Sequence, residues 1–311
     1  MVVDAGNFSL NRDKIKDHEL PRQRRTVELL LDGFAATPFP ITALGIGERD
    51  LLMGGEWLMN AVEERHLPHV MSNLQCEGLN FVESRVHVLE EVSVEFLSFV
   101  SPTLLEKEPM GDFLTASSML SDCTAIEPIT WLKNHPKESD IRVAFADLNR
   151  NEITSLAPYV DIVIESKIGK TTPEPEALDS NTVLFGVGSK GQNLGELSWI
   201  YDSTKSGFES GDKKAIKERD LTRRRERLKN LDAQRKNLAE DDVELKKIQR
   251  QLEYTKRSIA MLEQEISNIP TANDSVMKLS SNLVTLNKEV ANHSETDKLI
   301  DKAQFELENI Q

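Results

Sequence analysis

The sequence predicts an α/β (α+β) protein, a two-sheet αββα sandwich that carries a long antiparallel helical hairpin. Short apolar runs alternate with helical stretches and then give way to an antiparallel stretch, which suits two packed sheets between helices. Residues 212–269 contain no glycine and repeat leucine or isoleucine every seven residues, the spacing of paired helices. A chain of 311 residues can bury a substantial core.

Each expected element follows from local residue type. Short apolar or β-branched runs bounded by turn residues are expected to be strands, at 2–4, 41–44, 69–72, 85–100 (one strand or two), 141–146, 161–164, 183–187 and 194–201. Longer stretches with helical spacing are expected to be helices, at 20–36, 50–66, about 122–134, 151–157, the two arms of the hairpin and about 295–308. A last strand at 283–286 is expected to lie beside 197–201.

The two arms are expected to pack along an apolar coiled-coil seam. Asp241 with Glu244 resembles the capping box that begins a helix, and Pro270 ends the second arm. A single helix of ~85 Å is the alternative. The hairpin is favoured because its halves are nearly equal in length and because it returns the chain to the body. The seam residues are Leu221, Leu228, Leu231, Leu238, Leu245, Leu252, Ile259 and Ile266.

Charge and glycine content divide the chain into three parts. Residues 1–211 carry 18 Lys and Arg against 33 Asp and Glu and form an acidic body. Residues 212–269 carry 16 against 12 and form the basic hairpin, whose charged faces are either solvated or a docking surface. Residues 270–311 supply the return strand and a C-terminal helix that pack on the body. The acidic body and the mixed charge of the arm argue against a nucleic-acid partner.

Four strand-end loops read Asp4-Ala5-Gly6-Asn7, Gly45-Ile46-Gly47-Glu48-Arg49-Asp50, Asp147-Leu148-Asn149 and Glu165-Ser166-Lys167-Ile168-Gly169. Their order and context resemble those of the metallophosphoesterases, in particular the N-terminal domain of the UshA-like 5′-nucleotidases. In that family the loops read DAGD, GNHE, H-L-G and G-H-S-H or G-H-S-Q. The segments 70–74 and 183–197 also resemble the family's V-S-A-N strand and its A-G-x-x-G-x-x-L-G-x-L turn. The resemblance covers most of 1–211 and, more weakly, 275–311.

The resemblance implies a two-metal phosphoesterase site, but its motif positions are substituted. Isoleucine cannot ligate a metal, and glycine cannot protonate a leaving group, so no catalytic residue, cofactor or metal is expected. The bridging aspartate of the family aligns with Asn7, its metal-binding asparagine with Ile46, its catalytic histidine with Gly47, one histidine ligand with Asp147, and the paired ligands with Lys167 and Gly169.

Structural roles are expected for the polar residues that remain in these loops. Asp4 and Asn7 are expected to brace their turn. Asp50 is expected to cap a helix that begins at Leu51. Lys167 is expected to stand where a metal stood and to pair with Asp147 or Glu165, and its replacement by Ala should lower stability.

Several features leave the setting of the protein open. The family's first strand, with its D-x-H loop, has no counterpart before residue 2. No signal peptide is recognised and no apolar run approaches the ~20 residues that cross a bilayer. A periplasmic or extracytoplasmic location rests only on analogy with exported bacterial relatives. Cys76 and Cys123 are expected to be two buried thiols rather than a disulfide, and the six histidines to be exposed or hydrogen-bonded.

Two functions follow from the sequence. The first is a catalytically degenerate 5′-nucleotidase-like module, a pseudoenzyme, which binds a protein partner or another copy of itself through the hairpin. The alternative is a metal-dependent phosphoesterase with a non-standard or incomplete ligand set. Mn, Zn or Mg would then be held by Asn7, Asp50, Asp147 and Glu165. Substitution at all four loops favours the first.

Overall fold

The computed structural model divides into two compact units, Met1–Glu209 with Val276–Gln311 and Ser210–Ser275. It describes residues 1–10, 12–106, 112–120, 122–166, 171–179, 181–188, 193–205, 207–210, 213–236, 243–268 and 276–285.

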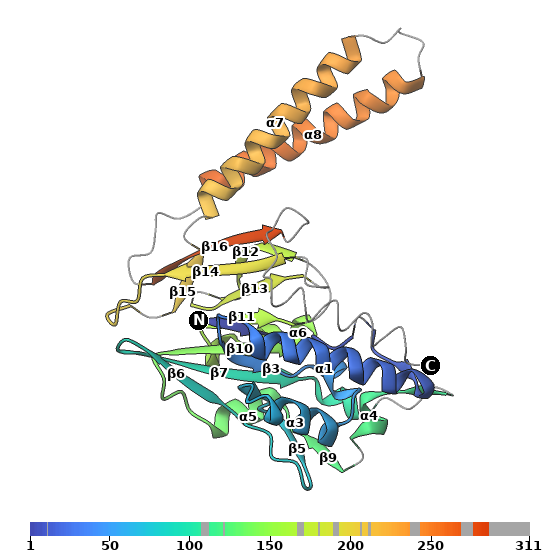
Figure 1. The fold of residues 1–311 in the computed structure, drawn as a ribbon. Coiled ribbons are helices and arrows are strands. Elements are labelled where there is room, and N and C mark those ends of the chain that lie inside the picture. The colour runs from blue at the N-terminus through green and yellow to red at the C-terminus, as the bar shows by residue number, and fades with distance from the viewer. Residues whose placement is uncertain are drawn as a thin grey trace. The chain divides into compact units, whose positions relative to one another are not determined.

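The first unit is built on two main sheets (Figure 1). The smaller sheet has the parallel order β1-β3-β4 and consists of β1 (Val2–Asp4), β3 (Ile41–Gly45) and β4 (His69–Val70). The larger sheet has the order β12-β13-β11-β10-β7-β6. Its strands are β6 (Arg85–Leu89), β7 (Val92–Val100), β10 (Ile141–Asp147), β11 (Ile162–Glu165), β12 (Thr171–Ala177) and β13 (Val183–Val187).

Alternation of side chains along the strands places a separate core on each face of each sheet. Phe96 and Phe145 pack between the two sheets, together with Ala43 and Val70 of the smaller sheet. Their neighbours Leu97 and Ala144 face the other way. There they meet α5 (Pro128–Asn134) and α6 (Arg150–Leu156), through residues such as Trp131, Leu132, Ile153 and Leu156.

The opposite face of the smaller sheet has its own helical cover. Leu44 of β3 and Met71, which follows β4, pack with Val27 and Leu31 of α1 (Leu20–Ala36). Leu58 and Val62 of α3 (Gly55–Glu64) belong to the same cluster. The layers are therefore helix, sheet, sheet and helix, and the expected αββα sandwich is confirmed.

The strand that follows the hairpin joins a third sheet of the first unit. Its order is β14-β16-β15, from β14 (Asn193–Trp199), β15 (Phe208–Ser210) and β16 (Met277–Thr285). The expected last strand is thus longer, and it lies antiparallel to β14 with Leu283 opposite Gly195. The smaller elements are β2 (Ile15–Lys16), α2 (Glu48–Leu51), β5 (Leu74–Cys76), β8 (Phe113–Leu114), α4 (Ala116–Met119), β9 (Cys123–Ala125) and short 3-10 turns at 17–19, 102–106 and 157–159.

Two expected helices are wrong in part. The helix expected at 50–66 is broken into α2 and α3, because Gly54 takes a φ of +89° that other residues rarely adopt. The helix expected at 122–134 starts only at Pro128, and the strand β9 precedes it. The expected helix at 295–308 lies outside the described residues.

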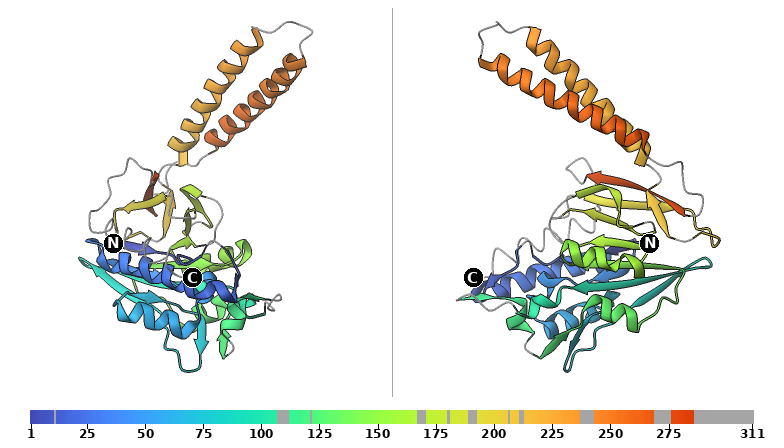
Figure 2. Two further views of the ribbon diagram at one scale, coloured as in Figure 1. Left: turned by 45° about the vertical axis from the view of Figure 1, so that its right-hand side comes forward. Right: turned by 180° about the vertical axis from the view of Figure 1, so that it is seen from behind.

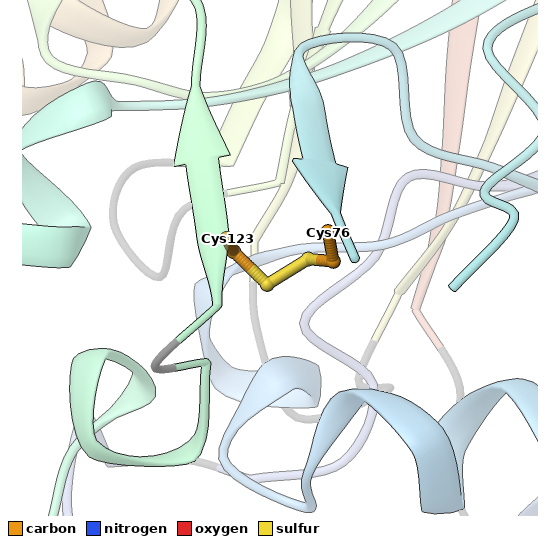
Figure 3. Close-up of a disulfide and its surroundings, with 2 residues drawn as sticks. All are labelled: Cys76 and Cys123. Carbon is orange, nitrogen blue, oxygen red and sulfur yellow. A yellow bond between two sulfur atoms is a disulfide. The ribbon is translucent and has the colours of Figure 1, made fainter. Parts of the chain in front are cut away.

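The expectation of two free thiols is also wrong. Cys76 and Cys123 lie directly opposite each other on the paired strands β5 and β9 and form a disulfide (Figure 3). Strand pairing brings their Cα atoms to 4.0 Å, although 47 residues separate them in sequence. Nothing in the sequence spacing of two lone cysteines shows this pairing.

The second unit consists of α7 (Lys213–Lys236) and α8 (Val243–Ser267), which lie side by side (Figure 2). Leu221, near the start of α7, packs with Ile259 and Leu262 near the end of α8. Leu231, near the end of α7, packs with Ile248 and Leu252 near the start of α8, so the helices run antiparallel. Leu228 and Ile266 are partly buried against these clusters, Leu245 is half-buried, and Leu238 lies outside the described residues.

Charged side chains accompany the apolar contacts of this pair. Lys217 pairs with Glu265, and Arg225 Nη2 lies 2.6 Å from Glu263 Oε1. Both pairs join the first half of α7 to the last turns of α8. Among the described residues, no helix is long and apolar enough to cross a membrane.

Candidate functional site

The four strand-end loops meet at the carboxyl ends of parallel strands from both main sheets. The first two follow β1 and β3, which are neighbours in the smaller sheet, and the others follow β10 and β11 of the larger sheet. Hydrogen bonds between these loops help to join the two sheets. Asn7 Nδ2 donates to Ser166 O at 3.2 Å, and Glu48 N donates to Asp147 Oδ2 at 2.7 Å. The structure therefore brings together residues that lie up to 159 positions apart in sequence.

Asp50 holds the first two loops together. Its side chain is 0% exposed and accepts three backbone N–H groups. Asn7 N and Gly47 N donate to Oδ2 at 2.7 and 2.9 Å, and Ser9 N donates to Oδ1 at 2.9 Å. Burial raises the pKa of Asp50 to about 7, against the effect of these donors. The prediction that Asp50 caps a helix beginning at Leu51 is wrong, because α2 begins at Glu48. Asp50 is the third residue of that helix, and its side chain accepts the N–H of the capping residue Gly47.

Asn7 occupies the space beside Gly47. The turn puts Asn7 at a φ of +59°, directly after Gly6 at +94°. A β-carbon on Gly47 would lie 2.5 Å from Asn7 Cγ, an overlap that could only be relieved by moving the carboxamide. Asn7 Oδ1 also accepts Arg49 N at 2.9 Å. The carboxamide thus fills the position into which a side chain at residue 47 would project.

The remaining sequence-predicted residues lie around this pair. Asp4 Oδ1 accepts Gly6 N at 2.9 Å, which closes the turn after β1. Ile46 is 0% exposed and belongs to the core under the helices. Asp147 is 5% exposed, and Glu165 ends β11. Lys167 and Gly169 lie outside the described residues, so the expected pairing of Lys167 stays a prediction.

The described side chains do not make up a metal-ligand set. Two metal ions would require several carboxylates and imidazoles converging on one space. Among the described residues, no three His, Cys, Asp or Glu side chains come close enough together to hold an ion. Asp50 instead accepts N–H groups of its own loop and of the first loop, and Asp147 accepts one of the second loop.

Sequence reasoning missed two contributors to the site. Ser9 joins it because its N–H and its Oγ reach Asp50 and Arg49 O. Arg49 is anchored by Asp13, with Nε and Nη2 each 2.7 Å from Oδ1, while its Nη1 is buried without a hydrogen-bond partner among the described atoms. The buried Ser166 Oγ also has no hydrogen-bond partner among the described atoms. No local sequence signal marks these residues.

One histidine departs from expectation. His69, in β4, is 4% exposed, and neither ring nitrogen has a hydrogen-bond partner among the described atoms. Burial and the nearby Arg85 lower its pKa. His69 is therefore a buried, uncharged ring in the core.

Comparison with known proteins establishes the fold. The chain matches no family model and no curated protein sequence. It resembles the structure of the sulfate thiohydrolase SoxB from Thermus thermophilus in complex with glycerol, with a TM-score of 0.52 and 13% identity over 65% of this chain and 36% of that one. The calcineurin-like phosphoesterase YfkN from Bacillus subtilis aligns over 99% of this chain and 83% of its own, with a TM-score of 0.48 and 12% identity.

A 5′-nucleotidase precursor from Thermus thermophilus aligns with a TM-score of 0.45 and 15% identity, over 65% of this chain and 42% of its own. The fold is that of the metallophosphoesterases. The solved structures that resemble this chain include a sulfate thiohydrolase, 5′-nucleotidases and a calcineurin-like phosphoesterase. The chain spans only about two fifths of the length of several of them.

Proposed function

We propose that this chain is a metallophosphoesterase-fold protein without metal-dependent phosphoesterase activity, which acts as a binding or scaffold module through its helical hairpin. Its four strand-end loops bind one another instead of metal ions. The basic hairpin, α7 with α8, supplies the contact surface. The partners are proteins, including a second copy of this chain, and an extracytoplasmic setting accords with the Cys76–Cys123 disulfide.

The use of the loop carboxylates as backbone acceptors carries this proposal. Both oxygens of Asp50 accept N–H groups, and one oxygen of Asp147 accepts Glu48 N. A metal ion at these groups would have to displace hydrogen bonds that hold the loops in place. Asn7, whose amide is neutral, replaces the carboxylate that would bridge two cations.

Metal content and turnover test the proposal together. The full chain is incubated with manganese and zinc, desalted exhaustively and measured by elemental mass spectrometry, and hydrolysis of bis(p-nitrophenyl) phosphate is followed in parallel. We expect no stoichiometric metal and no hydrolysis above the metal-only rate. Asp147→Ala is measured beside Asp13→Ala, whose carboxylate is exposed. Two ions per chain, lost in Asp147→Ala but kept in Asp13→Ala, would overturn the proposal.

The second candidate is a metal-dependent phosphoesterase with a departed ligand set. The shared fold favours it, and so does the fact that Asn7 and Asp147 both accept N–H groups of the second loop, from Arg49 and Glu48. Asp50 and Glu165 would be further ligands. It requires Asp50 to exchange buried N–H donors for a cation. The same two measurements decide between the candidates.

A further inference from the structure

We propose that the outer face of α8 is a self-complementary surface on which a second copy of this chain docks, α8 against α8 in antiparallel orientation. The inference rests on the proposed role of the hairpin as the contact element. It specifies which face of the hairpin makes the contact, which residues form that face and which partner binds there.

Two large apolar side chains stand exposed on this helix. Tyr254 is 76% exposed and Met261 is 64% exposed, although α8 buries its other apolar face against α7. They are seven residues apart and therefore lie on one line along the helix. At ~100° per residue this line runs about 150° from the seam formed by Ile248, Leu252 and Ile259. It faces away from α7.

One pair of opposite charges on the same face is arranged symmetrically about one point, whereas Lys247, also exposed there, falls opposite the uncharged Asn268. The point lies between Arg257 and Ser258, midway between Tyr254 and Met261. Arg250 and Glu265 are equally distant from it on either side, and both are exposed. A two-fold axis at this point would set each Tyr254 against Met261 of the second copy. It would also set each Arg250 at the height of a Glu265 of the second copy.

This symmetry favours a second copy over an acidic partner. A uniformly basic face would favour an acidic partner. Here the face has a basic end at Arg250 and an acidic end at Glu265, so the basic end of one copy is complementary to the acidic end of the other. Glu265 already accepts Lys217 of its own α7, and a carboxylate can accept from two cations at once. The one unfavourable approach is at the axis, where the two Arg257 side chains come near each other.

The contact is expected to be weak. The face from residue 247 to residue 268 is about 32 Å long, and one helix-to-helix contact falls at the low end of interface sizes. A dissociation constant on the order of micromolar or weaker follows, so association should depend on concentration.

Sedimentation velocity of the full chain over a range of about 1–200 µM tests the inference. The mass is expected to rise from that of the 35.1 kDa monomer toward twice that value. Tyr254→Glu should weaken association at least about tenfold, as loss of a buried aromatic anchor does. Lys256→Glu, which places the same acidic residue on the far side of α8, should leave association unchanged. Circular dichroism confirms that each variant keeps its helices.

Charge exchange tests the register. Arg250→Glu and Glu265→Arg should each weaken association, and the double variant should restore it toward the wild-type value. Arg257→Gln should tighten the contact, because it removes the like charges at the axis. A mixture of Tyr254→Cys and Met261→Cys chains should cross-link across the interface, whereas Tyr254→Cys alone should not.

Several results would overturn the inference. They are a monomer at every concentration, an effect of Lys256→Glu equal to that of Tyr254→Glu, a failure of the double variant to recover, and weakening by Arg257→Gln. Metal content and turnover are measured separately. A monomeric chain that also binds no metal would remove this inference and leave the metal-free site standing.

Discussion

Replacement of Asp50 by asparagine tests whether the strand-end loops are held by hydrogen bonds. Asp50→Asn keeps the shape of the side chain and exchanges one acceptor oxygen for a donor. Two N–H groups converge on Oδ2 and one on Oδ1, in a site with no solvent access. The amide oxygen would best take the Oδ2 position. Its NH₂ would then face the N–H of Ser9, and one buried donor would lose its acceptor.

The cost follows from these contacts. A buried donor left without an acceptor costs about 1–3 kcal/mol, and the opposed NH₂ group adds a second such penalty. We therefore expect Asp50→Asn to lower the free energy of unfolding by about 2–4 kcal/mol. For a unit of this size each kcal/mol moves the midpoint by about 2–4 °C, so Tm should fall by about 4–16 °C.

The effect should depend on pH, in a direction fixed by the pKa of Asp50. Burial raises that pKa to about 7 in the folded chain, whereas an unfolded aspartate has a pKa of about 4. The folded state then holds a proton that the unfolded state has released between these values. The resulting stabilisation is complete below pH ~4 and is lost as pH rises through ~7. The gap between wild type and Asp50→Asn should therefore be wider at pH 5 than at pH 8.

Urea unfolding at both pH values, followed by circular dichroism, measures these quantities. Asp13→Asn is the control, because Asp13 belongs to the same cluster but its side chain is 63% exposed. It should cost less than about 1 kcal/mol. Equal losses in the two variants would refute the role of Asp50. A wider gap at pH 8 would show that the N–H donors, rather than burial, control its pKa.

Three further perturbations probe the rest of the molecule. Reduction of the Cys76–Cys123 disulfide should destabilise the first unit by about 4 kcal/mol, from the entropy of a 47-residue loop, and urea unfolding with and without reductant checks this. Leu252→Ser should lower the temperature at which the hairpin unfolds and leave the main unfolding transition unchanged, and thermal unfolding followed by circular dichroism checks this. Gly47→Ala should destabilise the chain through overlap with Asn7, and Asn7→Gly should relieve part of that loss, so that in thermal unfolding the double variant costs less than the two single variants added together.

The sequence predicted the layers because apolar residues recur at a regular spacing along buried strands and helices. The strands of the larger sheet alternate between two cores, and the apolar pattern of 141–146 already contains that alternation. It did not predict β12, whose segment holds Pro173 and Pro175. Proline is tolerated there because β12 lies at the edge of its sheet, where a ladder hydrogen bond can be absent. Edge position depends on tertiary structure and leaves no local signal.

The site was predicted in its positions but not in its contacts. The four loops were located from their order, and the structure brings the described parts of all four together. The role of Asp50 could not be predicted, because two of its three N–H donors lie 41 and 43 residues away. The disulfide could not be predicted for the same reason, because the pairing of β5 with β9 brings together two cysteines that lie far apart in sequence.

Parallel strands in two facing sheets end at a common edge, so their loops bring several polar groups into one confined space. Those groups need partners, because a buried acceptor or donor without one is costly. Metal ions can supply such partners, and so can the N–H groups of neighbouring loops. Here Asn7 lies against Gly47, and Asp50 accepts backbone N–H groups of both loops, so the residues at positions 7, 47 and 50 depend on one another. A histidine placed at residue 47 would meet the carboxamide of Asn7, and a carboxylate at residue 7 would face the N–H of Arg49 without a cation. A metal site at these loops would therefore require concerted change at several positions.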